Sequence, residues 1–79
     1  MRLDKYLKVS RLIKRRTIAN QACHADKITV NGKVARASYN VKIGDLITIN
    51  MGKTPLSVKA VSIVEKVGKD SAAEMYEVV

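Results

Sequence analysis

An Asn-Gly pair at residues 31 and 32 joins two short stretches that contain β-branched residues and alternate between apolar and polar side chains. Both central positions of a type I′ turn require positive φ, which asparagine and glycine adopt most readily. The pair is therefore the strongest hairpin signal in the chain, and it predicts strands over residues 28–30 and 33–35. An antiparallel sheet thus begins less than halfway along the sequence.

Two short helices are predicted before this hairpin. Apolar residues that include Leu3 and Tyr6 recur at helical spacing in residues 2–13, and Asp4 in the first turn suits the helix dipole. Tyr6 shares the face of Leu3, so we expect it in the core. Small apolar residues repeat in residues 16–25, which predicts a second helix that packs closely on the first. Two helices of this length are not stable alone, so the sheet must cover them.

The remaining chain predicts further strands and loops. The tail, residues 72–79, is ambiguous between a helical turn capped by Asp70 or Ser71 and a strand over residues 76–79. The fold class is α+β, with N-terminal helices packed on a small, mostly antiparallel sheet that ends in a C-terminal β extension. The predicted segments are a strand entry over 40–45 with a turn at Gly44 and Asp45, strands over 46–50 and 56–64, and loops over 51–55 and 68–71.

The excess of positive charge lies entirely in the first half of the chain. The 79 residues have a formal net charge of +8. Residues 1–42 contain eleven basic and two acidic residues, a net charge of +9, whereas residues 43–79 have a net charge of −1. Such a concentration indicates a polyanion partner, most often nucleic acid and sometimes an anionic membrane.

These basic residues are expected to converge on one face of the domain. Few acids are interleaved with them, which distinguishes the surface from an ordinary solvated helix face. The planar fork of arginine matches the oxygens of a phosphate. The candidate residues for binding a polyanion are Arg2, Lys5, Arg11, Lys14, Arg15, Arg16, Asn20, Lys27 and Lys33.

Other classes of function have little support in the sequence. The single cysteine, Cys23, excludes an internal disulfide and indicates a reducing, cytoplasmic compartment. Cys23 and His24 are adjacent, so on a helix they cannot form a nucleophile–base pair, and two ligands do not close a zinc site. No apolar run approaches the length of a membrane helix. We therefore expect no catalysis, metal, cofactor, small-molecule substrate or membrane partner.

Several motifs together resemble the S4 RNA-binding domain, also called the αL motif. They are Met-Arg-Leu-Asp-Lys-Tyr-Leu at 1–7, the basic turn at 14–16, Val-Asn-Gly-Lys at 30–33 and Val-Lys-Ile-Gly-Asp-Leu-Ile at 41–47. The resemblance covers residues 1–50 in the correct order and spacing. Residues 51–79 are similar to the β extension of small stand-alone bacterial members, of the RqcP and fifteen-kilodalton heat-shock types. We expect this extension to belong to the same single domain.

The resemblance also implies which residues contact RNA. Arg2 and Arg16 match the RNA-contacting positions of the family, and Lys14, Arg15, Asn20 and Lys33 flank them. Many relatives have serine or threonine in place of Arg15, so the cap of the second helix is in question.

A cellular role is implied by the same resemblance. RqcP-type members bind obstructed large ribosomal subunits carrying peptidyl-tRNA, with contacts to rRNA and tRNA, and assist RqcH in adding C-terminal alanine tails to stalled chains. Heat-shock-type members recognise large subunits with trapped nascent chains. The residues alone also leave open a DNA-binding helix–turn–helix protein. An RNA-modifying enzyme is less compatible, because no catalytic domain accompanies the motifs.

Overall fold

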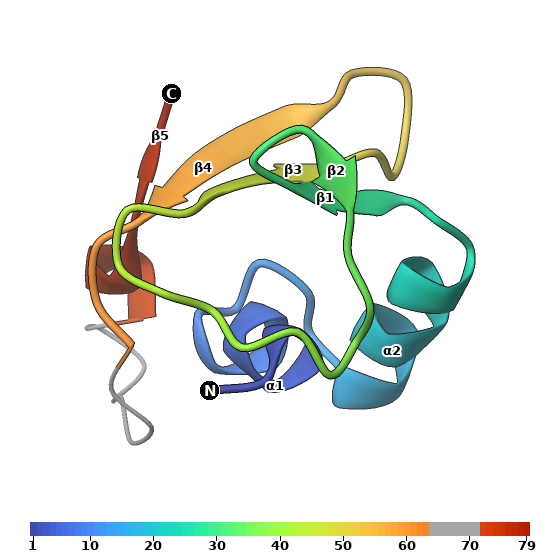
Figure 1. Ribbon diagram of the computed structural model, residues 1–79, viewed down its shortest axis with the longest axis horizontal. Helices are drawn as coiled ribbons and strands as arrows, with labels where there is room; N and C mark the ends of the chain where they lie inside the picture. The colour runs from blue at the N-terminus through green and yellow to red at the C-terminus, as the bar shows by residue number, and fades with distance from the viewer. Residues whose placement is uncertain (64–71) are drawn as a thin grey trace.

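The computed structural model describes residues 1–63 and 72–79, and its two α-helices form one layer beneath a sheet (Figure 1). Helix α1 (Leu3–Val9) buries Leu3 and Tyr6 completely. Helix α2 (Arg16–His24) turns its small residues Ala19 and Ala22 into the core, where they allow it to pack closely on α1. This is the helix pair that the sequence predicts.

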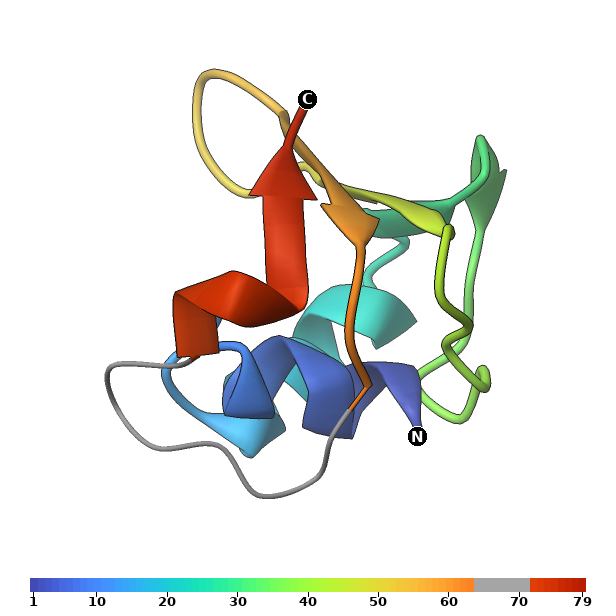
Figure 2. The ribbon, with the colours of Figure 1, turned by 90° about the vertical axis from the view of Figure 1, so that its left-hand side faces the viewer.

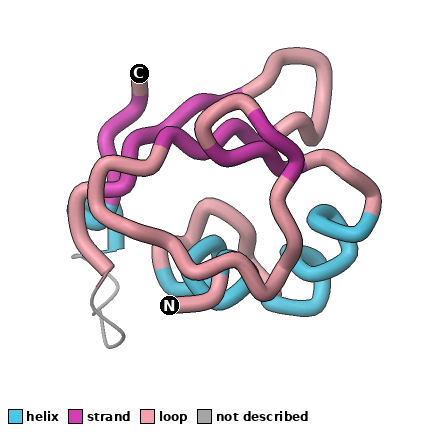
Figure 3. The backbone as a smooth tube through the Cα atoms, in the orientation of Figure 1, coloured by secondary structure: helices cyan, strands magenta, loops and turns pink. Residues whose placement is uncertain are grey.

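A sheet forms the second layer (Figure 3). It has five strands, and every pair of neighbouring strands is antiparallel. The strand order is β2-β1-β3-β4-β5. The predicted α+β fold class is therefore confirmed. The strands are β1 (Ile28–Val30), β2 (Lys33–Val34), β3 (Leu46–Ile49), β4 (Leu56–Ala60) and β5 (Tyr76–Val78).

Alternation along the strands separates the two faces of the sheet. Ile28, Ile47 and Val58 face the helices and are fully buried, because successive side chains of a strand point to opposite sides. The opposite face carries the hydroxyl groups of Thr48 and Ser57, which lie in register and are hydrogen-bonded at 3.0 Å. The core therefore lies between the sheet and the helices.

The predicted hairpin is present with the expected turn chemistry. Asn31 and Gly32 connect β1 to β2 with φ values of 52° and 83°. The side-chain oxygen of Asn31 also accepts the N–H of Leu46, and its amide donates to Asp45 at 3.1 Å. The turn is thus bonded to the beginning of β3 as well as to its own hairpin.

The first helix is shorter than predicted. It ends at Val9, and Arg11 adopts a φ of 63° that is incompatible with a continuing right-handed helix. Ile13 nevertheless remains in the core, only 7% exposed, at the end of a non-helical connection. The prediction extends too far because residues 12 and 13 are apolar. Their side chains pack in or against the core without helical backbone.

The strand entry predicted over residues 40–45 is wrong. Only Asn40 makes an isolated bridge there, to Arg2, and the segment otherwise forms a loop and a turn. The buried carboxylate of Asp45 accepts the N–H of Lys42 and the hydroxyl of Tyr39, so a side chain supplies hydrogen bonds that a neighbouring strand would supply in a sheet. Strand β4 likewise ends at Ala60 rather than 64.

The C-terminal segment combines both of its predicted alternatives. A 3₁₀ turn (Ala72–Met75) leads directly into β5, which pairs with β4 (Figure 2). Met75 is 1% exposed and completes the core beside α1. The loop predicted over 68–71 and the caps predicted at Asp70 and Ser71 lie outside the described residues.

Candidate nucleic-acid interface

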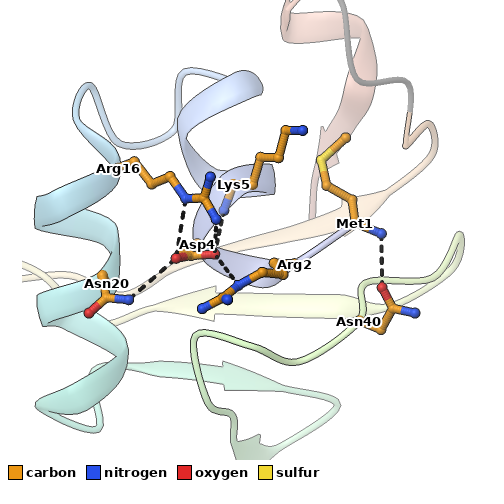
Figure 4. Close-up of polar contacts among 7 residues, drawn as sticks. All are labelled: Met1, Arg2, Asp4, Lys5, Arg16, Asn20 and Asn40. Carbon is orange, nitrogen blue, oxygen red and sulfur yellow. Dashed lines mark hydrogen bonds and ion pairs between the residues drawn. The ribbon is translucent and has the colours of Figure 1, made fainter.

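A buried carboxylate gathers three of the predicted RNA-binding residues. Asp4 is 2% exposed in the first turn of α1 (Figure 4). The Nε atom of Arg2 donates to its Oδ1 at 3.3 Å, and Nδ2 of Asn20 donates to its Oδ2 at 3.3 Å. Arg16 donates from Nε to Oδ2 at 3.3 Å and from Nη2 to Oδ1 at 3.5 Å. We call these four residues the Asp4 cluster.

Opposing effects act on the ionisation of Asp4. Burial alone raises the pKa of a carboxyl, but the hydrogen bonds from Asn20, Arg16 and the backbone N–H of Lys5 outweigh it and hold the pKa of Asp4 below its ordinary value. The carboxylate is therefore ionised at neutral pH, and it attracts both arginines.

Local structure fixes the position of each cluster member. Arg16 and Asn20 are four residues apart on α2, so they share one face of that helix. Arg2 precedes α1 and is held by its bridge to Asn40. The N–H of Asp4 itself donates to the carbonyl of Ala37 at 3.2 Å. The loop after β2 thereby positions the start of α1 against α2.

The arginine heads remain accessible above the buried carboxylate. The side chains of Arg2 and Arg16 are 52% and 47% exposed, whereas that of Asp4 is 3% exposed. The terminal nitrogens of Arg2 donate to none of the residues that the structure describes. Each guanidinium group can therefore bind Asp4 on one edge and a phosphate on another.

Two surface hollows flank the cluster. The first hollow has a volume of about 440 Å³, lies between α2 and residues 34–38, and is lined by Arg2 and Asn20. Arg16 and Asn20 line another of about 350 Å³. Arg36 lines the first hollow as well and is exposed, although it is absent from the predicted set. Its position as the fifth arginine, directly after the hairpin, is the signal that could have identified it.

The other predicted residues are not hydrogen-bonded into the Asp4 cluster through their side chains. Lys14 and Arg15 line a separate hollow of about 330 Å³. Arg15 is the N-cap residue of α2 and makes no capping hydrogen bond through its side chain, as its residue type predicts. The remaining positions are Lys5 in α1, Arg11 in the connection between the helices, Lys27 just before β1 and Lys33 in the edge strand β2.

The described residues bear on three other kinds of feature: a reactive thiol, a metal site and a membrane-spanning helix. Burial, reinforced by the charge of Asp4, raises the pKa of the Cys23 thiol, which disfavours its reactive thiolate. No group of three or more potential metal ligands occurs within residues 1–63 and 72–79. No helix in this part of the chain is long and apolar enough to cross a membrane.

Comparison with known proteins identifies the family. The model of the S4 domain matches residues 1–47, which is more than half of the chain. The chain belongs to the S4 domain family. The resemblance found in the motifs is therefore confirmed.

Several S4 relatives match nearly the whole chain. The RQC P-site tRNA stabilizing factor of Halalkalibacterium halodurans is 51% identical over 99% of this chain and 89% of the relative. The protein of the same name from Bacillus subtilis is 45% identical over 99% of this chain and 91% of the relative. Heat shock protein 15 of Vibrio cholerae, described as trimeric, superposes with a TM-score of 0.92 at 30% identity, covering 100% of this chain and 81% of the other. The fold similarity to this structure thus extends through β5, beyond the residues that the S4 model matches.

Proposed function

We propose that this chain is an RNA-binding protein of ribosome-associated quality control that binds obstructed large ribosomal subunits carrying peptidyl-tRNA. The observation that carries the proposal is the Asp4 cluster, which presents two half-exposed arginines within the basic half of the chain. The name of these relatives, RQC P-site tRNA stabilizing factor, supports tRNA as one ligand.

The proposed mechanism is positional rather than catalytic. Arginine and lysine side chains bind phosphates of rRNA and tRNA and hold the tRNA in place, while RqcH adds alanine residues to the stalled chain. Phosphate contacts fix position without reading sequence. Residues 1–50 would supply this surface and residues 51–79 would extend the supporting sheet. A ribosomal role places the protein in the cytoplasm.

The proposed interface contains the full set of basic candidates. Arg2, Arg16 and Asn20 form its centre, because they are the residues joined by Asp4. Arg36 is added here because it lines a hollow with Arg2. The peripheral contacts would come from Lys5, Arg11, Lys14, Arg15, Lys27 and Lys33.

Co-sedimentation with large ribosomal subunits that carry peptidyl-tRNA tests the interface. We expect Arg2→Ala and Arg16→Ala each to abolish association. Each variant leaves Asp4 with other partners, so the fold should be retained. Lys53→Ala, which removes one exposed charge from the loop before β4, is the matched control and should still co-sediment. Undiminished co-sedimentation of both arginine variants would contradict the proposal.

A second candidate function is the recycling of large subunits with trapped nascent chains. The structural similarity to heat shock protein 15 favours it. Affinity purification from cells separates the two candidates. Recovery of large subunits together with peptidyl-tRNA and RqcH would support the alanine-tailing role, whereas recovery without RqcH would favour recycling. Recovery of small subunits would contradict both.

A further inference from the structure

A carboxylate is an unexpected group beneath a surface that binds phosphate. Residues 1–42 have a net charge of +9, yet Asp4 lies in contact with both central arginines. Net charge alone would attract a polyanion more strongly without this residue. The presence of Asp4 therefore requires a reason other than attraction.

We propose that Asp4 is a positioning residue, which holds the guanidinium groups of Arg2 and Arg16 in the orientation that binds RNA phosphates. This inference rests on the proposed function and deepens it. On this inference, a residue whose own negative charge repels the ligand sets the orientation of the basic side chains that bind it.

The contacts show how one carboxylate can orient two arginines. Asp4 engages both through Nε, and it holds Arg16 through Nη2 as well (Figure 4). Both terminal nitrogens of Arg2 and one of Arg16 have no acceptor among the described residues. These nitrogens are available to a phosphate without breaking the contacts to Asp4.

Holding the side chains in advance lowers the entropic cost of binding. A free arginine samples many rotamers, and part of the binding free energy is lost when a ligand must immobilise it. Asn20 assists by donating to Oδ2, which fixes the carboxylate itself. Burial of Asp4 at 3% side-chain exposure also keeps its charge away from an approaching phosphate.

The test replaces Asp4 with its uncharged isostere and measures affinity for the same large subunits at fixed salt concentration. Asp4→Asn raises the net charge by one, but we expect about tenfold weaker binding, because two arginine side chains must be immobilised again. Glu77→Gln makes the same change in net charge at an exposed position of β5, away from the hollows that the Asp4 cluster lines. This control should bind equally well or slightly more tightly.

A double-mutant cycle separates positioning from a general structural effect. If Asp4 acts through the arginines, Asp4→Asn should have little further effect on affinity in a protein that already carries Arg2→Ala and Arg16→Ala. The affinities are measured at low salt, where residual binding is detectable. An additive loss would indicate a structural role and overturn the inference. Arg16→Lys provides a second variant that keeps the charge and Asp4 but lacks Nε, and it should also bind about tenfold more weakly.

The outcomes distinguish the inference from the function beneath it. If Arg2→Ala and Arg16→Ala both bind normally, the proposed interface is wrong. If Arg16→Ala weakens binding while folded Asp4→Asn binds as tightly as the wild type or more tightly, only the role of Asp4 is wrong. If Asp4→Asn does not fold, Arg16→Lys provides the test instead. Normal affinity of Arg16→Lys would then overturn the positioning role of Asp4.

Discussion

The hydroxyl of Tyr6 donates a 2.7 Å hydrogen bond to the backbone carbonyl oxygen of Met75. The two residues are 69 positions apart in the sequence, and both are almost completely buried. The same carbonyl accepts the N–H groups of Val61 and Ser62 at 2.9 and 3.1 Å. One oxygen therefore joins α1, the two residues that follow β4 and the turn before β5.

Removing this hydroxyl should lower stability without affecting the interface. Tyr6→Phe is expected to reduce the free energy of unfolding by about 1 kcal/mol, since the carbonyl of Met75 keeps its two backbone donors. Urea unfolding measures the change. Tyr76→Phe is the control, because its hydroxyl bonds to none of the described residues, and it should cost less. Equal losses would contradict this account.

Alkaline pH should destabilise the protein through the same residue. Burial, assisted by the nearby Tyr76, raises the pKa of Tyr6 from 10.0 to about 12. A folded-state pKa above the unfolded value means that this stability is present below pH 10 and is lost as the pH rises toward 12. Thermal unfolding across this range should show a decrease that is smaller in Tyr6→Phe. The same decrease in the wild type and in Tyr6→Phe would show that other titrating groups cause the loss of stability.

The hairpin turn should be stabilised by side-chain contacts as well as by its backbone. Asn31→Gly keeps the positive φ but removes two hydrogen bonds, to Asp45 and from Leu46. We expect a loss of about 1–2 kcal/mol in the free energy of unfolding. Asn50→Gly, at an exposed position after β3, measures the entropic cost of glycine alone. A loss no larger than that of the control would show that the two bonds contribute nothing.

Arg36 should contribute to RNA binding although the motifs do not include it. It lines the same hollow as Arg2, so Arg36→Ala is expected to weaken binding to large subunits uniformly and to reduce the slope of log affinity against log salt by about one. A salt titration of the variant beside Lys53→Ala measures this. An unchanged slope would place Arg36 outside the interface.

Local chemistry explains what could be predicted from the sequence. The Asn31-Gly32 turn depends on two residues with positive φ, and it was located correctly. Helix α2 was predicted within one residue because its small apolar positions repeat regularly. Tyr6 was correctly assigned to the core from its spacing relative to Leu3.

Tertiary contacts explain what could not be predicted. The early end of α1 depends on the left-handed backbone at Arg11, a residue type that gives no warning of it. Asp45 replaces an expected strand entry with a loop by bonding to Tyr39 and Lys42. Asp4 was interpreted only through the helix dipole, because its partner Arg16 is twelve positions away and reaches it only when α2 packs on α1.

The contact between Tyr6 and Met75 also sets the order in which the chain can fold during its own synthesis. Helix α1 is translated early, but the residue that covers its tyrosine follows 69 positions later. The nascent chain therefore exposes part of its core to chaperones and proteases until Met75 has been translated. Folding is completed only after Met75 emerges from the ribosome.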